Sequence, residues 1–90
     1  MRIAIIAIDK ANAQQTRMDN RQDHLAYIEK TGVVEMAGPF LDLDGNMCGS
    51  LLILSLNSLA EAEIWAANDP YAKAGLFESV TVKAWKKVIG

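Results

Sequence analysis

The chain has one histidine, His24, and any proton-transfer chemistry has to be built around it. A carboxylate bound to one ring nitrogen of a histidine fixes its tautomer and leaves the other nitrogen free to move a substrate proton. The most distinctive carboxylate is Asp69, in the segment Asn68-Asp69-Pro70-Tyr71. Pro70 cannot continue the preceding helix and holds Asp69 out of the α region, while Asn68 is suited to a left-handed cap. We therefore expect Asp69 at a sharp corner. There its side chain either forms a hydrogen bond with the backbone of its own turn or binds His24, and the sequence alone leaves both possibilities open.

Three further residues could contact a ligand. Arg21 precedes His24 by three residues, which places it about one helical turn away on the same face. It could bind an anionic group, or it could pair with a surface carboxylate. Ser50 could donate a hydrogen bond into a cleft, and Gly38 allows a ligand to approach the backbone closely.

Other kinds of chemistry have no support in the sequence. There is no Gly-rich phosphate loop, no nucleophile elbow and no Cys/His cluster, and one histidine with one cysteine cannot build a typical structural zinc site. We expect no metal and no cofactor. Cys48 is alone, so nothing indicates secretion, and we expect an inert core thiol. The net charge of −2 argues against nucleic acid as a partner. No segment is long enough for a membrane span, so a soluble cytoplasmic protein is expected.

Hydrophobic periodicity predicts four strands and two helices around these residues. The 16–31 helix would bury a stripe of Met18, Leu25 and Ile28, with His24 at its edge. Ser58 and Glu61 form a capping-box pattern at the start of the second helix. Residues 71–76 are expected to be a short connector. The strands are expected at 2–9, 33–40, 48–56 and 77–88, and the helices at 16–31 and 59–67.

The order β-α-β-β-α-β predicts one α+β domain over residues 1–90 with a ferredoxin-like fold, an antiparallel sheet with two helices on one face. The first and third strands are apolar at consecutive positions, so the face without helices must also be covered. A second copy of the same sheet is the simplest cover. We therefore expect a homodimer packed sheet to sheet, as a dimeric α+β barrel, and a ligand cavity lined by that face is the alternative.

Several motifs, taken together, resemble the YciI-like (YCII-related) family over nearly the whole chain. The resemblance implies a ferredoxin-like dimeric α+β barrel and a site built on a His-Asp pair, here His24 and Asp69. Arg21 and the Gly38-Pro39 turn match positions near that site. Many relatives have Phe where this chain has Tyr71, which adds one hydroxyl. The matching segments are Asn20-Arg21-Gln22-Asp23-His24-Leu25, Met36-Ala37-Gly38-Pro39-Phe40, Trp65 with Asn68-Asp69-Pro70-Tyr71, Ala74-Gly75-Leu76 and Val80-Thr81-Val82.

The leading hypothesis is a small cofactor-independent enzyme in which His24 is the general acid/base and Asp69 orients it. A family member that acts as a dehydrochlorinase on a hydroxylated aromatic favours elimination or isomerisation on a small cyclic or aromatic, anionic or phenolic molecule. The candidate contacts to that molecule are Arg21, Gly38, Pro39, Ser50 and Tyr71. Two other hypotheses stay open: a non-catalytic small-molecule-binding or regulatory dimer that uses the same cleft, and a structural module whose sheet docks another protein.

Overall fold

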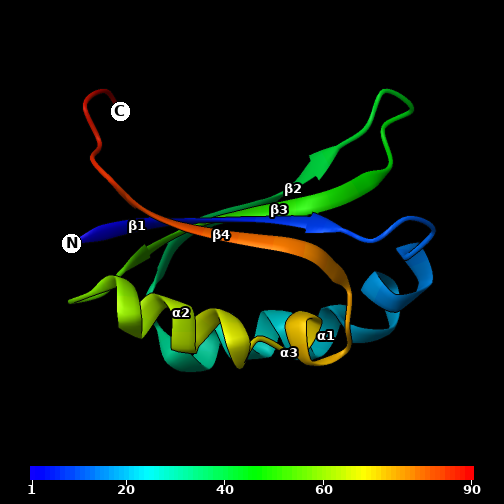
Figure 1. Cartoon of the computed structure of the whole chain (residues 1–90), viewed down its shortest axis with the longest axis horizontal. Helices are drawn as coiled ribbons and strands as arrows, with labels where there is room; N and C mark the ends of the chain where they lie inside the picture. The colour runs from blue at the N-terminus through cyan, green and yellow to red at the C-terminus, as the bar shows by residue number, and fades with distance from the viewer.

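The computed structural model describes residues 1–90 and shows an antiparallel sheet of four strands with all helices on one face (Figure 1). The strand order is β2-β3-β1-β4, and every neighbouring pair is antiparallel. This confirms the predicted ferredoxin-like α+β fold. No helix is long and apolar enough to cross a lipid bilayer. The elements are β1 Arg2–Asp9, α1 Gln14–Thr31, β2 Val34–Leu41, β3 Met47–Ser55, α2 Leu59–Ala67, α3 Pro70–Lys73 and β4 Phe77–Trp85.

The expectation of a plain connector at 71–76 was wrong, because a short helix, α3, begins at Pro70. Asp69 is its N-cap: the backbone of Asp69 is extended, and its side chain accepts a hydrogen bond from the N–H of Tyr71. A capping carboxylate followed by proline at the first helical position favours a new helix. The expected left-handed conformation of Asn68 was also wrong, since its φ of −94° and ψ of −2° are right-handed. The bend is made by the extended Asp69 instead.

The core lies between the sheet and the helices, where Ile5 of β1 packs with Leu52 and Leu54 of β3 and Trp65 of α2. Ile5 pairs directly with Leu52 across the β1–β3 ladder, so both side chains point to the same face. The alternate residues of the two strands point away from the helices.

The expected apolar stripe of α1 was wrong in part. Met18 is 64% exposed and Leu25 is 46% exposed, while the buried residues of this helix are Arg17 and His24. The reason is that α1 faces a partly polar cavity in front of the sheet and not only the apolar core. A helix over such a cavity turns its polar side chains inward.

The second face of the sheet carries exposed apolar side chains and no helix (Figure 1). Leu51 pairs with Ile6, and Met36 pairs with Ile53, so these residues share the side opposite the core. Met36 is 55% and Leu51 is 37% exposed. A groove bounded by β2 residues and Leu51 runs over this face. The chain by itself therefore leaves this face uncovered.

Candidate active site

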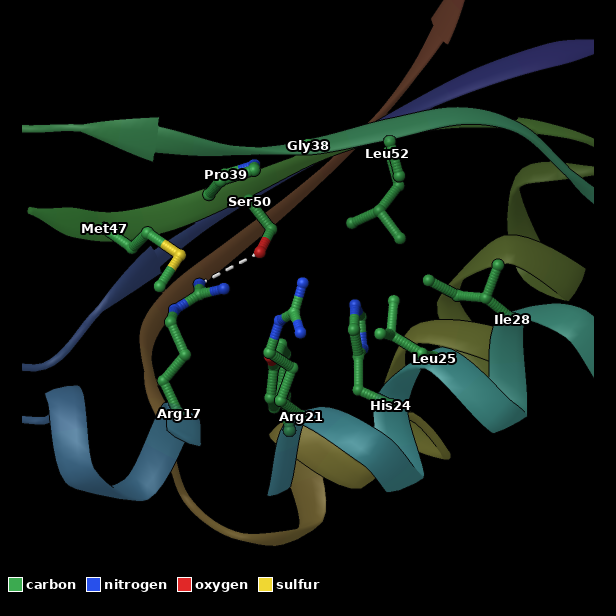
Figure 2. Close-up of a pocket in the computed structure, with 12 residues that line it drawn as sticks. Arg17, Arg21, His24, Leu25, Ile28, Gly38, Pro39, Met47, Ser50 and Leu52 are labelled. Atoms are coloured by element: carbon green, nitrogen blue, oxygen red, sulfur yellow. Dashed lines mark hydrogen bonds between the residues drawn. The ribbon is translucent and has the colours of Figure 1, made fainter. Parts of the chain in front are cut away.

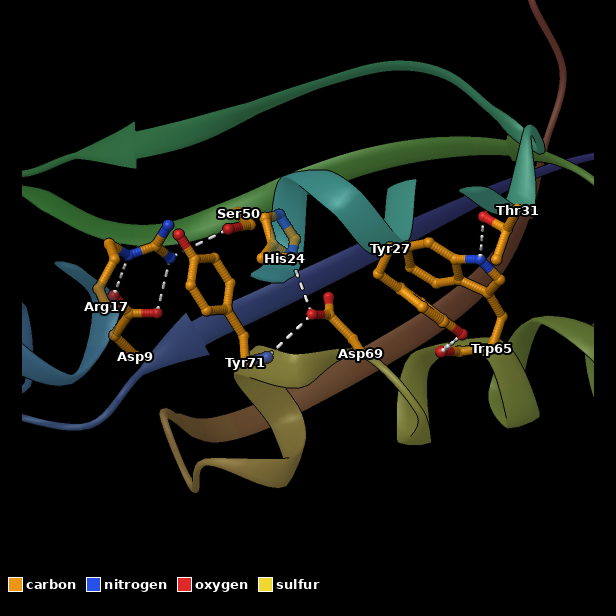
Figure 3. Close-up of polar contacts among 9 residues, drawn as sticks. All are labelled: Asp9, Arg17, His24, Tyr27, Thr31, Ser50, Trp65, Asp69 and Tyr71. Atoms are coloured by element: carbon orange, nitrogen blue, oxygen red, sulfur yellow. Dashed lines mark hydrogen bonds and ion pairs between the residues drawn. The ribbon is translucent and has the colours of Figure 1, made fainter. Parts of the chain in front are cut away.

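His24 of α1 and Asp69 of the corner before α3 meet in the structure, although they are 45 residues apart in the sequence. The distance from His24 Nδ1 to Asp69 Oδ1 is 2.8 Å, and both side chains are buried. The same Oδ1 accepts the N–H of Tyr71 at 2.9 Å (Figure 3). Asp69 is thus a turn-forming residue and the partner of His24 at once, so the two readings of its position do not exclude each other.

The second ring nitrogen of His24, Nε2, faces open space. Every fully buried side-chain nitrogen or oxygen in the protein has a hydrogen-bond partner, and Nε2 has none, so it is not sealed in. His24 lines a cavity, and its ring points into that cavity (Figure 2). Because the Asp69 carboxylate can only accept, Nδ1 carries the proton. In the neutral form of the imidazole, Nε2 presents its lone pair to the cavity.

The cavity has a volume of about 190 Å³ and lies between α1 and the strands β2 and β3. Asp69 contacts the His24 ring from the side away from the cavity and does not line the cavity itself. Leu25 and Ile28 of α1 and Leu52 of β3 supply apolar surface. The expected contact residues Arg21, Gly38, Pro39, Ser50 and Tyr71 all line this one cavity. Figure 2 labels all of them except Tyr71.

Sequence reasoning missed Arg17 and Asp9, which form a buried ion pair beside the cavity. Arg17 Nε lies 2.8 Å from Asp9 Oδ2, and Nη2 lies 2.9 Å from Asp9 Oδ1. Nη2 also donates to Ser50 Oγ at 3.0 Å. Burial by itself lowers the pKa of Arg17. The hydrogen bond and the charge of Asp9, with smaller contributions from Tyr71, together outweigh that effect, so the net pKa is above its ordinary value. Arg17 therefore stays charged.

The sequence holds only a partial signal for this pair. Arg17 precedes Arg21 by four residues and His24 by seven, which is the spacing of one helical face. Asp9 ends the apolar run of β1 and is the first acidic residue of the chain. A solvent-facing helix side carries the same polar stripe, so this spacing places the three side chains on one face but does not show that the face is buried.

The ring of Tyr71 lies between Arg17 and His24 (Figure 3). It stacks on the imidazole of His24 with a centroid distance of 3.9 Å and an angle of 13°. Its centroid is 4.8 Å from the Arg17 guanidinium carbon, and its edge meets Phe77. Burial raises the pKa of Tyr71. The positive charges of Arg17 and Arg21 lower this pKa, the negative charge of Asp69 raises it, and the net pKa is above its ordinary value. The Tyr71 hydroxyl is therefore protonated at neutral pH.

Both tyrosines of the chain are expected to resist ionisation while the protein is folded. Burial raises the pKa of Tyr27, and the charge of Asp69 adds to this. Unfolded tyrosine ionises near pH 10, so the free energy of unfolding should be unaffected below that pH and should fall as pH rises above it. Urea unfolding at pH 8 and pH 10.5 and a 295-nm absorbance titration test this. Ionisation of both tyrosines at pH 10 in the folded protein would contradict it.

The fold and the site together define a class: ferredoxin-like α+β proteins with a buried His-carboxylate pair beside a small cavity. The chain belongs to the YCII-related family, because the model of the YCII-related domain matches residues 1–86. It is 38% identical over 97 aligned positions to the protein YciI of Escherichia coli O6:H1, with 98% of this chain and 99% of that protein covered. An uncharacterized protein of Haemophilus influenzae is 34% identical with the same coverage.

Two solved structures place the chain among known folds. The 5-chloro-2-hydroxyhydroquinone dehydrochlorinase TftG of Burkholderia phenoliruptrix, solved in complex with 2,5-dihydroxybenzoquinone, is 37% identical, with a TM-score of 0.88. The match covers 96% of this chain and 94% of that structure. An antibiotic biosynthesis monooxygenase, at 12% identity and a TM-score of 0.60 over 98% of each chain, shares the fold alone.

Proposed function

We propose that the protein is an enzyme that moves protons on a small hydroxylated cyclic or aromatic molecule, with His24 as general acid/base. The observation that carries this proposal is the pairing of His24 Nδ1 with Asp69 while Nε2 is left free at a cavity. In this arrangement Asp69 holds the ring orientation and stabilises the imidazolium that forms when Nε2 accepts a proton.

The cavity volume supports a substrate with a single ring. A protein cavity of about 150 Å³ lined by apolar side chains holds one benzene molecule. At about 190 Å³, this cavity has room for one six-membered ring with a few small substituents. A nucleotide or a polycyclic molecule would extend well outside it.

The charges around the cavity favour a substrate that becomes anionic. Asp9 neutralises Arg17, and Asp69 is bound to His24. Arg21 lines the cavity and forms no ion pair with the protein. When a substrate hydroxyl gives its proton to His24, the new imidazolium faces Asp69 and the new oxyanion faces Arg21. Each charge created by the transfer then meets an opposite charge that is already in place.

The reaction that we propose is a keto–enol tautomerisation of the ring, followed by elimination where a leaving group is present. His24 takes a proton from a ring hydroxyl and returns it to a ring carbon. If that carbon bears chlorine, His24 then takes the proton of a second ring hydroxyl, the electron pair of that oxygen forms a carbonyl, and the C–Cl bond breaks so that chloride departs. The net change is loss of HCl. TftG, a dehydrochlorinase of a chlorinated hydroxyhydroquinone at 37% identity, supports this class of substrate.

The test is turnover of 5-chloro-2-hydroxyhydroquinone by the purified wild-type chain. We expect stoichiometric chloride release with the appearance of a quinone absorbance, faster than in buffer alone. The chlorine-free 2-hydroxyhydroquinone is the control, and in D₂O it should exchange a ring hydrogen without releasing chloride. Binding of these molecules with neither release nor exchange would overturn the proposal and favour a non-catalytic binding protein.

We also propose that a second copy of the chain covers the open face of the sheet, as a homodimer. The exposed Met36 and Leu51 on a face without helices support this. Sedimentation at micromolar concentration should give about twice the 9.8 kDa of one chain. A stable monomer at that concentration would contradict a homodimer, and the exposed face would then be free for a different protein.

A further inference from the structure

Two segments rise from the open face of the sheet, at opposite ends of the molecule (Figure 1). One is the turn between β2 and β3 with the last residue of β2, residues 41–46, which we call the hairpin arm. The other is the chain after β4, residues 86–90, which we call the tail arm. The helices lie on the opposite face of the sheet. A second sheet packed on the open face would therefore lie between the two arms.

Both arms expose large apolar side chains. Leu43 of the hairpin arm and Val88 and Ile89 of the tail arm are the three most exposed large apolar residues of the chain, at 108%, 83% and 91%. Leu41, also on the hairpin arm, is exposed as well. Apolar side chains gathered on projecting segments, with charged residues beside them, are typical of a surface that binds another protein.

The two arms carry opposite charges. The hairpin arm has Asp42 and Asp44, the tail arm has Lys86 and Lys87, and none of the four forms an ion pair within the chain. Because the arms lie at opposite ends of the molecule, the acidic arm does not meet the basic arm of its own chain. A second copy of the chain, turned end for end, brings an arm of the opposite charge to each of them.

The hairpin arm is already ordered before it binds. Asp42 Oδ1 accepts the N–H groups of Asp44 and Asn46, both at 2.9 Å, and the Asp42 carbonyl accepts the N–H of Gly45 at 3.0 Å. Asp42 therefore holds the turn, while the Asp44 side chain is free for a partner. A preorganised segment loses little conformational entropy when it binds.

We propose that the two chains of the homodimer clasp each other, with the hairpin arm of each chain bound to the tail arm of its partner. A two-fold axis between facing sheets that is perpendicular to the line joining the arms produces this contact twice. An axis along that line would place acid against acid and base against base, and like charges repel. The inference rests on the homodimer proposed above, to which it adds an orientation and a contact, and it does not depend on the reaction.

The test is disulfide trapping between the arms. In a Cys48→Ser background, which retains a donor to the Phe40 carbonyl, one preparation carries Leu43→Cys and another carries Ile89→Cys. We expect neither preparation alone to form a covalent dimer under mild oxidation. Mixed in equal amounts and allowed to exchange subunits, they should give covalent dimers for about half of the protein, the statistical share of mixed pairs. Ile64→Cys, exposed on α2 in the helix layer, is the matched control and should not react with Leu43→Cys.

Charge exchange between the arms is the second measurement. Asp44→Lys and Lys86→Glu should each raise the Kd of the dimer roughly three- to thirtyfold, because every dimer contains the contact twice. The double variant should be no weaker than either single variant, since residues that meet are not additive. Lys30→Glu makes the same change of charge at an exposed position of α1 and should leave the Kd unchanged.

A covalent dimer from Leu43→Cys alone would show that like arms meet, and it would overturn the clasp while the homodimer stands. A mixture that sediments as a dimer and forms no disulfide would also overturn it, as would single-variant losses that multiply in the double variant. A monomeric wild type would overturn the homodimer and the clasp together. Chloride release is measured separately, so the reaction and the clasp fail independently.

Discussion

Replacing Asp9 with alanine is expected to lower the free energy of unfolding by about 3–5 kcal/mol, because it leaves the buried Arg17 without its partner. The two side chains are 4% and 5% exposed and share two hydrogen bonds. Domains of this kind unfold at a total cost of about 5–15 kcal/mol, so the loss would be a large part of the stability. Urea unfolding followed by tryptophan fluorescence measures it.

Two controls separate the buried charge from the mutation itself. Glu35→Ala breaks an ion pair of similar length, Arg2 to Glu35 at 2.7 Å, that is 42% and 35% exposed, and should cost at most about 1 kcal/mol. The double variant Asp9→Leu with Arg17→Met replaces the pair by apolar side chains and should be far more stable than Asp9→Ala. If Asp9→Ala and Glu35→Ala cost the same, Arg17 is hydrated and the pair is not buried in solution.

The fold could be predicted because each strand and helix carries its own local signal. The apolar runs of β1 and β3 set the central strands, and Ser58 caps α2 as expected, although Glu61 bonds the residue before the N-cap and not Ser58 itself. Ser58 Oγ accepts the N–H of Glu61 at 3.2 Å, and Glu61 accepts the N–H of Asn57. α3 escaped prediction because a single turn has too few residues for a periodic pattern, and only the Asp69-Pro70 pair marked its start.

The sequence identified only those site residues whose type or neighbouring residues are unusual. His24 is the one histidine of the chain, and the Asp-Pro sequence singled out Asp69. Arg17 resembles any surface arginine in the sequence, because apolar residues were expected to mark the buried side of α1. Burial of Arg17 follows from its bidentate pair with Asp9, a contact between β1 and α1 that helical periodicity does not encode.

His24→Gln is expected to reduce kcat/KM for 5-chloro-2-hydroxyhydroquinone by about 10²–10⁴, because glutamine can form hydrogen bonds but cannot move a proton at neutral pH. Asp69→Asn should approach the same loss, since a neutral amide does not stabilise the imidazolium. The double variant should be no worse than His24→Gln alone, because two residues that act as a unit are not additive. Full turnover by His24→Gln would contradict the role of His24 as the base.

The two functions of Asp69 can be separated by comparing asparagine with alanine. One oxygen, Oδ1, serves both His24 and the N–H of Tyr71, and an asparagine side chain retains an oxygen at that position. Asp69→Asn should therefore keep the cap of α3 and most of the stability while it loses activity. Asp69→Ala should lose activity and also about 1 kcal/mol of stability, the usual cost of an N-cap.

Because the chain has one histidine, ¹⁵N NMR of the imidazole reports its tautomer without ambiguity. A wild-type ring protonated on Nε2 alone would show that Asp69 does not accept from Nδ1, and the activity loss in Asp69→Asn would then need a different cause.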